Sequence, residues 1–538
     1  SMSAPITWSL FIRHDPWLDN GLEVLAGMAE AIARQHPAVL NVRLEPDGLH
    51  LEIHQPQRFA RLLSHQVELQ VENAYYISGP GHKELKPFVG FNRQPRRQHP
   101  ELYRGKETIE AFIQDLLAEI SQPSNRRSRF TCPFCGGPAT EKRTLSLYPF
   151  VTKTKALGGQ AVWEEAGFRG LNEYGPICTI CAFLGMLAWS DTALLYRCDI
   201  GGPQGKGKRK ETRTALLALP WPQPLDLRRL HAQKQRYRHA LNPAHRRSNV
   251  QVVVHWGNRE REDWPPQAFT MLLAFYEAAL SRVLREIQEG GEEGLFEPTA
   301  LRGVIPDGWI LLRIPQGRMK DITATDWFME DAVLRVLRSM IEADILPYQG
   351  ILTGMWLTLE GRPIDEETAA WREERAAAFL QNDYGRFAAG FGVRRRQTLG
   401  FYGEAAQGLH RWIQIWLEER KAMNEQELEL VRRAGRTIGR IAGAQRRATI
   451  LYEMERARTP SDLLGVLSDV VHRLVGMEAQ EMRDQYLSLE ALDRLTALIH
   501  QTGDDARRFA DMKHTLFIYA GLEYAGVIRG QTAETTGR

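Results

Sequence analysis

The chain has 538 residues, of which 43% are hydrophobic and 25% are charged. This composition excludes a disordered chain and is typical of a globular protein of roughly two to four domains. The formal net charge is only +3, so the overall charge indicates no partner, and a case for nucleic acid must rest on where the cations lie.

The first residues carry no sign of export. Ser1 before Met2 is typical of the residue left by a cleaved tag, and no basic segment followed by an apolar one comes after it. The longest apolar run, residues 177–189, is shorter than the ~20 residues of a membrane helix. We therefore expect a soluble, cytoplasmic protein.

Residues 1–121 are predicted to form an N-terminal α/β part. Apolar residues at helical spacing predict a helix over residues 22–35, with Asn20 as a possible cap. Alternating apolar residues between 42 and 53, around the turn Pro46-Asp47-Gly48, predict a β-hairpin. A second helix is expected over residues 107–120.

Four of the five cysteines form two C-x-x-C pairs, Cys132 with Cys135 and Cys178 with Cys181. Two residues between thiolates let a tight turn bring both sulfurs onto one metal ion, and Gly136 permits that turn. Four thiolates suit Zn²⁺ in a closed tetrahedral site, so we expect a structural zinc. The 42 residues between the pairs predict an inserted zinc-binding lobe, assigned to residues 122–200.

Two other interpretations of the cysteines remain open. They could be two unrelated thiol pairs, one of them redox-active. Alternatively, His99-Pro100-Glu101 with Cys132 and Cys135 resembles the zinc-deaminase pattern H-x-E followed by P-C-x-x-C. Thr131 stands where that pattern has proline, and the second cysteine pair would then have no role.

Residues 201–367 are expected to complete the N-terminal domain with a basic loop and a basic helix. Strands are predicted at residues 193–200 and 214–219, on either side of a glycine-rich tip. Further strands are expected at 250–256 and 309–314, with a long helix over 267–289 between them. The whole N-terminal region is thus predicted to be α+β.

Residues 201–247 contain twelve lysines and arginines against two acids. A solvated surface normally mixes charge signs, so this imbalance favours nucleic-acid contact, with an ordinary charged helix face as the alternative. The candidate contacts in the tip are Lys206, Lys208, Arg209 and Lys210. Those in and after the helix are Arg228, Arg229, Lys234, Arg236, Arg238, Arg246 and Arg247.

Beyond residue 368 the apolar residues recur at spacings of three and four almost to the end, which predicts an all-α helical-bundle C-terminal domain. Residues 431–452 contain six arginines and no acid. Arg432, Arg436, Arg440 and Arg447 share one helical face, which we interpret as a track for a polyanion. Pairing with acids of neighbouring helices is the alternative. No catalytic constellation or nucleotide-binding loop is found, so we do not expect an enzyme.

The two C-x-x-C pairs, Cys132/Cys135 and Cys178/Cys181, resemble those of the CRISPR-associated CXXC-CXXC family. Members of that family are large subunits of type I effector complexes (Cascade). Residues 15–22, DPWLDNGL, are also similar to the start of such subunits. The length, the cysteine-bearing N-terminal part and the helical C-terminal part agree with the family across most of the chain.

The resemblance implies a non-catalytic subunit of a prokaryotic antiviral-defence complex. Such a subunit recognises the protospacer-adjacent motif on duplex DNA, assists R-loop opening, holds the displaced strand and docks the helicase-nuclease. Its partners would be guide RNA, target DNA, and the backbone and small subunits of Cascade, while guide-RNA pairing reads the remaining sequence. By this analogy the tip Gly201–Lys210 and the basic stretch after it become candidates for motif reading or strand wedging. The arginine face becomes a candidate track for the displaced strand.

In related systems the C-terminal part is also made separately from an internal start. Met423 precedes a plausible helix start and would give a segment of residues 423–538. Two other functions stay open, namely a zinc-dependent nucleobase deaminase-like enzyme and a free-standing zinc-ribbon regulator that binds nucleic acid.

Overall fold

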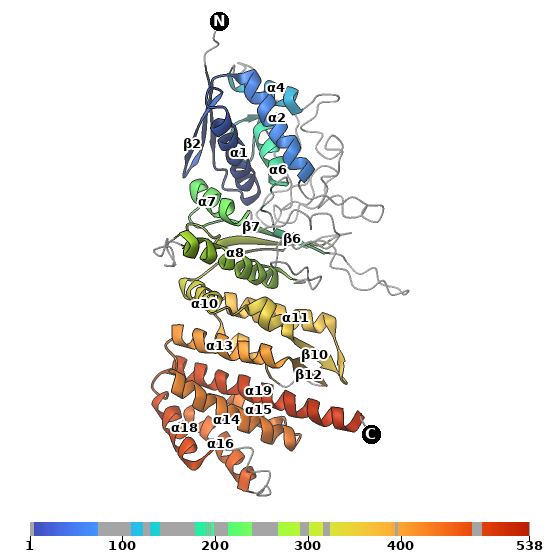
Figure 1. The fold of residues 1–538 in the computed structure, drawn as a ribbon, viewed down its shortest axis with the longest axis vertical. Helices are drawn as coiled ribbons and strands as arrows, with labels where there is room; N and C mark the ends of the chain where they lie inside the picture. The colour runs from blue at the N-terminus through green and yellow to red at the C-terminus, as the bar shows by residue number, and fades with distance from the viewer. Residues whose placement is uncertain are drawn as a thin grey trace. The chain divides into compact units, whose positions relative to one another are not determined.

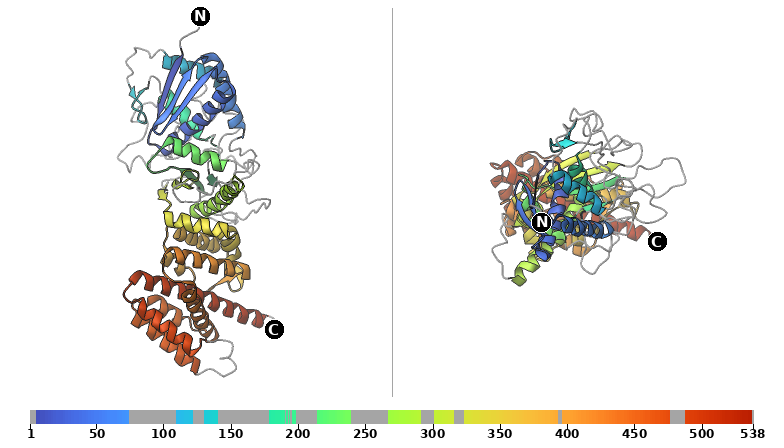
Figure 2. Two further views of the ribbon diagram at one scale, coloured as in Figure 1. Left: turned by 60° about the vertical axis from the view of Figure 1, so that its left-hand side comes forward. Right: turned by 90° about the horizontal axis from the view of Figure 1, so that it is seen from above.

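The computed structural model describes residues 5–73, 109–121, 130–139, 178–189, 191, 193, 195–197, 214–238, 267–290, 301–315, 323–392, 396–475 and 487–536. The chain, drawn as a ribbon in Figures 1 and 2, divides into two compact units. Unit 1 contains Ser1–Trp264 and Glu286–Phe328, and unit 2 contains Pro265–Arg285 and Met329–Arg538. None of the helices in the described ranges combines the length and the apolar character that a bilayer crossing requires.

Unit 1 begins with a three-stranded antiparallel sheet in the order β1-β3-β2, against which helices pack (Figure 2). The elements are β1 (Ile6–Phe11), α1 (Pro16–Gln35), β2 (Leu40–Glu45), β3 (Gly48–Ile53), α2 (Pro56–Asn73) and α4 (Ile109–Ser121). Trp8 and Leu10 of β1 lie opposite Leu51 and Leu49 of β3, and all four are buried on one sheet face. The predicted hairpin is confirmed, with Glu45 opposite Gly48.

Helix α1 begins at Pro16 rather than at residue 22. The Asp15 carboxylate accepts hydrogen bonds from the backbone N–H groups of Trp17 (3.0 Å) and Leu18 (2.8 Å), so Asp15 is the N-cap. Proline at the first helical position has no N–H to satisfy, which favours this start. Asn20, the predicted cap, lies inside the helix, and its amide donates to the Pro16 carbonyl at 2.7 Å.

The remaining elements of unit 1 carry the cysteines and the second sheet. They are β4 (Phe130–Thr131), β5 (Pro138–Ala139), α6 (Thr179–Trp189), β6 (Leu195–Arg197), β7 (Thr214–Pro220), α7 (Leu227–Arg238), β8 (Gly308–Pro315) and β9 (Thr323–Phe328). Strands β6-β7-β8-β9 form an antiparallel sheet in chain order. The strands predicted near residues 195, 214 and 309 are therefore confirmed, whereas the one predicted at 250–256 lies outside the described residues.

Unit 2 is mostly helical (Figure 1). It contains the first part of α8 (Ala268–Gly290), which was predicted over residues 267–289. Its other elements are α10 (Asp331–Glu342), η3 (Pro347–Ile351), η4 (Leu352–Gly354), β10 (Met355–Leu359), β11 (Arg362–Pro363), α11 (Asp365–Leu380), α12 (Tyr384–Ala389), β12 (Gln397–Phe401), α13 (Gly403–Glu419), α14 (Glu425–Ala444), α15 (Thr449–Arg456), α16 (Pro460–Val475), α18 (Leu489–Gln501) and α19 (Ala506–Thr536).

The prediction of an all-α domain starting at residue 368 needs correction. Strand β12 lies inside that region and forms the edge of a small antiparallel sheet in the order β11-β10-β12. The predicted boundary also falls within helix α11, and β12 pairs with β10 across it. The compact helical unit therefore starts at Met329, and it takes Pro265–Arg285 from an earlier part of the chain.

Half-buried Glu373 of α11 caps the start of α8. Its carboxylate accepts hydrogen bonds from the backbone N–H groups of Phe269 and Thr270, both at 2.8 Å. Burial raises the pKa of Glu373 above its usual value, while these hydrogen bonds lower it. A carboxylate supplied by another helix thus satisfies N–H groups at the start of α8 that have no partner within the helix.

Candidate metal centre and basic surfaces

The first cysteine pair lies in the turn between β4 and β5. The Cys132 N–H donates to the Gly137 carbonyl at 2.8 Å, and the Gly136 N–H donates to the Cys132 carbonyl at 2.9 Å. Gly136 has φ +70°, a left-handed conformation that glycine adopts without a Cβ clash. This turn aims the Gly137 N–H at the Cys135 sulfur, 3.4 Å away.

The second pair lies at the start of α6. Cys178 directly precedes the helix, Cys181 is in its first turn, and the Cys181 N–H donates to the Cys178 sulfur at 3.3 Å. The positive end of the helix dipole stabilises thiolates at this position. A hairpin turn and a helix start therefore each present two sulfurs.

The two turns bring all four sulfur atoms within 4.8 Å of one another. Cys132, Cys178 and Cys181 are buried, and Cys135 is exposed. Metal–sulfur bonds of about 2.3 Å in a tetrahedral site would separate the sulfurs by about 3.8 Å, so only small side-chain adjustments are needed. Four sulfur donors fit one thiophilic metal ion and complete its tetrahedral coordination. The predicted cysteine cluster is thus assembled.

The four thiols ionise unequally. The hydrogen bond with Cys135 lowers the pKa of Cys132 far below its usual range, and hydrogen bonds with Cys132 raise the pKa of Cys178 and of Cys181 above it. The Cys132 thiolate accepts hydrogen bonds from the other three thiols, and its negative charge opposes their ionisation. A bound cation would offset that repulsion and release the remaining protons.

Helix α6 is held in place by residues 15–22, at the start of α1. The Trp17 indole N–H donates to the Gly185 carbonyl of α6 at 2.9 Å. A Cβ on Gly21 would lie 1.9 Å from the Leu184 carbonyl oxygen, so only glycine allows α1 and α6 to approach this closely. Residues 15–22 therefore position the helix that carries Cys178 and Cys181.

The prediction that Lys234 contacts nucleic acid is wrong. Its side chain is fully buried, and its ammonium lies 2.5 Å from a carboxylate oxygen of Glu23 and 2.5 Å from one of Asp191. It also donates to the Asn20 side-chain oxygen at 3.0 Å. Asp191 lies just after α6 and Glu23 is on α1, so this ammonium connects three segments of the core of unit 1.

His231 extends the same network. Its ring nitrogens lie 2.9 Å from a Glu23 oxygen and 2.7 Å from a Glu30 oxygen. Burial alone would lower the pKa of His231, but the hydrogen bonds to the two carboxylates outweigh it and raise the pKa to about 9. The inward face of α7 therefore carries charges that are matched inside the protein.

The other candidate residues of α7 differ in their surroundings. Arg228 is exposed. Arg229 forms an ion pair with buried Asp307, and Arg236 lies 3.6 Å from Glu286. Lys206, Lys208, Arg209, Lys210, Arg246 and Arg247 lie outside the described residues, as does the side chain of Arg238.

The arginine face of α14 is partly neutralised. Glu523 of α19 lies 3.2 Å from the Arg436 Nε and 2.6 Å from the Arg440 Nε. Glu429 lies 3.3 Å from Arg432 and 3.0 Å from Arg433. The alternative of pairing with acids therefore applies to these four arginines, which share two glutamates.

Arg447 does not share this helix face. Helix α14 ends at Ala444, and Arg446 then adopts φ +51°, which turns the chain before α15. Arg447 is exposed in this turn. The spacing of seven residues between Arg440 and Arg447 therefore does not correspond to two turns of one continuous helix.

Three glycines explain why Glu523 reaches two arginines. Gly435, Gly439 and Gly443, at a spacing of four on α14, face α19. A Cβ on Gly439 would lie 2.3 Å from the Ala520 carbonyl oxygen, so the two helix backbones are nearly in contact. These glycines were not among the predicted features, although glycine at every fourth position of a helix is a visible signal for close packing.

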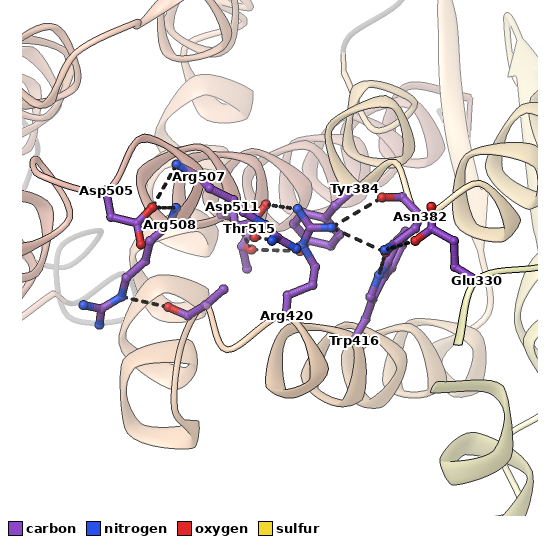
Figure 3. Close-up of polar contacts among 11 residues, drawn as sticks. Glu330, Asn382, Tyr384, Trp416, Arg420, Asp505, Arg507, Arg508, Asp511 and Thr515 are labelled. Carbon is purple, nitrogen blue, oxygen red and sulfur yellow. Dashed lines mark hydrogen bonds and ion pairs between the residues drawn. The ribbon is translucent and has the colours of Figure 1, made fainter. Parts of the chain in front are cut away.

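The segment starting at Met423 is joined to the chain before it by a buried polar cluster (Figure 3). The Arg420 guanidinium donates to both carboxylate oxygens of Asp511 in α19, at 2.8 and 2.9 Å. The Tyr384 hydroxyl lies 2.8 Å from that of Thr515. Asn424 caps α14 in a reciprocal arrangement with Glu427, as expected for a helix starting just after Met423.

A scan against protein-family models and a search of curated proteins find no match to this chain.

Proposed function

We propose that the chain is a non-catalytic, nucleic-acid-binding large subunit of a type I CRISPR RNA-guided complex, with a structural zinc ion in its four-cysteine cluster. In this role it would recognise the protospacer-adjacent motif on duplex DNA, assist R-loop opening, hold the displaced strand and dock the helicase-nuclease. Guide RNA, target DNA and the other Cascade subunits would be its partners.

The observation that carries the proposal is a contact between the two segments of the chain that resemble the CXXC-CXXC family. The two C-x-x-C turns resemble those of the CXXC-CXXC family, and residues 15–22 resemble the start of that family's large subunits. These residues, through Trp17 and Gly21, support the helix that carries Cys178 and Cys181. Two motifs that are far apart in sequence thus meet at one helix, which supports reading both as features of the same family.

The cysteine cluster supports a structural metal rather than a catalytic one. Cys132, Cys135, Cys178 and Cys181 would hold the ion, and zinc would supply a rigid cross-link between the β4–β5 turn and α6. Four protein ligands leave no coordination position for an activated water, which speaks against the deaminase-like alternative.

Several basic residues remain candidates for DNA contact. Arg228, Arg436, Arg440 and Arg447 keep part or all of their surface accessible in the described structure. The tip Lys206–Lys210, with Arg246 and Arg247, is proposed from its sequence alone. Lys234 is excluded because it is buried.

Co-expression with the neighbouring genes tests the proposed function. A tagged chain should purify with guide-length RNA, with further Cascade subunits and with one zinc ion per chain. The complex should bind duplex DNA containing one short motif more tightly than duplexes in which that motif is changed. A chain that purifies alone as a homodimer without RNA would favour the free-standing regulator instead.

The basic tip has a separate test. Replacing Lys206, Lys208, Arg209 and Lys210 together with alanine should weaken duplex binding and lower the salt slope by about 3–4, since each phosphate contact accounts for about 0.9. Arg43→Ala, an exposed substitution on β2, is the control and should leave the slope almost unchanged. An unaltered slope in the quadruple variant would remove the tip from the DNA-contacting surface.

A further inference from the structure

The four cysteines of the metal centre differ in their exposure. Cys132, Cys178 and Cys181 are buried, whereas Cys135 is exposed. All four sulfurs are thiolates when they hold a metal ion, so access to solvent is what distinguishes them. Susceptibility of a thiolate to oxidation follows its exposure, because the oxidant must reach the sulfur. Cys135 is therefore the expected point of attack in this centre.

A buried sulfur lies beside that of Cys135. The Sγ atoms of Cys135 and Cys178 are 3.6 Å apart. A disulfide bond is about 2.05 Å long, so the two sulfurs need to approach by only about 1.5 Å. The Cys181 N–H donates to the Cys178 sulfur at 3.3 Å and holds it at the start of α6. Cys178 is thus placed to attack an oxidised Cys135.

The turn that carries Cys135 has room for this approach. A Cβ on Gly136 would meet no atom of the described residues within 4 Å, so the turn borders open space there. Helix α6 is held more firmly, because the Trp17 indole donates to the Gly185 carbonyl. Cys135 can therefore move toward Cys178 while α6 keeps its position.

We propose that Cys135 is an oxidation site, at which peroxide converts Cys135 and Cys178 into a disulfide between the two turns with loss of the metal ion. A peroxide oxygen bonds to the Cys135 sulfur, the O–O bond breaks and hydroxide leaves, which gives a sulfenic acid. The Cys178 thiolate then attacks the Cys135 sulfur, so the S–S bond forms as the S–O bond breaks and a second hydroxide leaves. The two sulfurs together lose two electrons, which reduce the peroxide to hydroxide.

The disulfide replaces the metal ion as the link between the two turns. Only Cys132 and Cys181 remain as ligands, so the ion is released. The new bond closes the same 42-residue segment, and a dithiol reductant reopens it by thiol–disulfide exchange. This proposal rests on the structural metal of the proposed function, but not on the assignment of the chain to a CRISPR complex.

The test treats the full, zinc-loaded chain with hydrogen peroxide. A colorimetric chelator follows the released zinc, while differential alkylation and mass spectrometry identify the oxidised cysteines and separate them from Cys198, which lies outside the described residues. The first disulfide should join Cys135 to Cys178 and appear together with free zinc. Dithiothreitol with added zinc should restore the starting state. A first disulfide between any other two cysteines, or zinc release without a disulfide, would overturn the proposal.

Two histidine variants separate reactivity from metal binding. Histidine serves as a ligand in zinc sites of three cysteines and one histidine, but it forms no disulfide. Cys135→His should slow peroxide-driven zinc release about tenfold, because the exposed thiolate is gone. Cys132→His replaces a buried ligand and should release zinc at the unchanged rate. Equal rates in the two variants would count against Cys135 as the site of attack.

The zinc content before peroxide is added distinguishes the two proposals. A chain that purifies without zinc would overturn both the structural metal and the oxidation site. A zinc-loaded chain that forms a different disulfide would overturn the oxidation site alone. If either histidine variant fails to retain zinc, the disulfide map of the unchanged chain decides the outcome.

Discussion

Arg420, at the end of α13, and Asp511, at the start of α19, form an ion pair joined by two hydrogen bonds. Only 12% of the Arg420 side chain and 4% of the Asp511 side chain are exposed. Removing one partner of such a buried pair leaves the other charge uncompensated, at a cost of about 3–5 kcal/mol. Arg420→Met should therefore lower the stability of unit 2 by about 3 kcal/mol in urea unfolding. Arg433→Met removes an exposed arginine paired with Glu429 and should cost less than about 1 kcal/mol. Equal losses in the two variants would contradict this expectation.

The same pair predicts how residues 423–538 behave when they are expressed as a separate protein. That segment contains Asp511 but not Arg420. Asp511→Asn should therefore destabilise the full chain by about 3 kcal/mol and have almost no effect on the separately expressed segment, where water replaces the missing partner. Thermal unfolding of both forms, with and without the substitution, measures the difference. A similar loss in both would mean that Asp511 stabilises α19 through contacts within the segment.

Gly439→Ala should destabilise unit 2 by about 1–3 kcal/mol, because its Cβ would lie 2.3 Å from the Ala520 carbonyl oxygen and would push α14 and α19 apart. Gly465→Ala is the matched control. Gly465 lies in α16, where an added Cβ would meet no atom within 4 Å, so alanine there should raise stability by up to about 1 kcal/mol. Opposite signs in denaturant unfolding are expected. Destabilisation by both would show that the loss at Gly439 does not come from helix spacing alone.

Lys234→Met should destabilise unit 1 by about 3–5 kcal/mol, because it leaves the Glu23 and Asp191 carboxylates buried without their cation. Arg228→Met replaces an exposed residue of the same helix and should leave stability within about 0.5 kcal/mol. Urea unfolding distinguishes the two. A Lys234 variant that keeps its stability and loses DNA affinity would restore Lys234 as a surface contact.

The stability of unit 1 should depend on the protonation of His231. Its pKa is about 9 in the folded protein against 6.5 for an unperturbed histidine, so the contribution is complete below pH 6.5 and disappears as the pH rises to about 9. The contribution is at most about 3 kcal/mol. The difference in melting temperature between the unchanged chain and His231→Asn should be largest near pH 6 and should shrink by pH 9. A constant difference would mean that His231 is neutral when folded.

Removal of the metal should loosen the cysteine region before the helical unit. Cys132→Ser, or treatment with a strong chelator, should release zinc and increase hydrogen exchange in α6, because a four-thiolate site contributes folding free energy. Helices α14 and α19 belong to unit 2 and should keep their protection. A variant that retains both its zinc and its melting temperature would contradict the assignment of Cys132 as a ligand.

Local patterns predicted the local structure well. The hairpin around Pro46-Asp47-Gly48 and the two cysteine turns depend on residues close together in sequence, and each formed as expected. The start of α1 was misplaced because Asn20 and Asp15 are both good caps. The choice of Asp15 is set by Pro16, at a position where proline favours a helix start.

Long-range partners could not be predicted in the same way. Nothing near Lys234 in sequence shows that Glu23 and Asp191 meet it in the core, and a lysine in a basic helix is normally exposed. Glu523 lies too far along the chain from Arg436 and Arg440 to be paired with them by spacing. Strand β12 is five residues long and is stabilised by its pairing with β10 rather than by its own pattern.

The cysteine cluster connects positions that 42 residues separate in the sequence. A metal ion there would act as a tether that closes this segment into a ring, and the entropy of ring closure grows only with the logarithm of its length. Doubling the segment would cost about 0.6 kcal/mol. A longer segment between β5 and Cys178 would therefore add little to the entropy of closing this ring. Natural relatives of this chain should vary in length here while both cysteine turns and Gly21 stay unchanged.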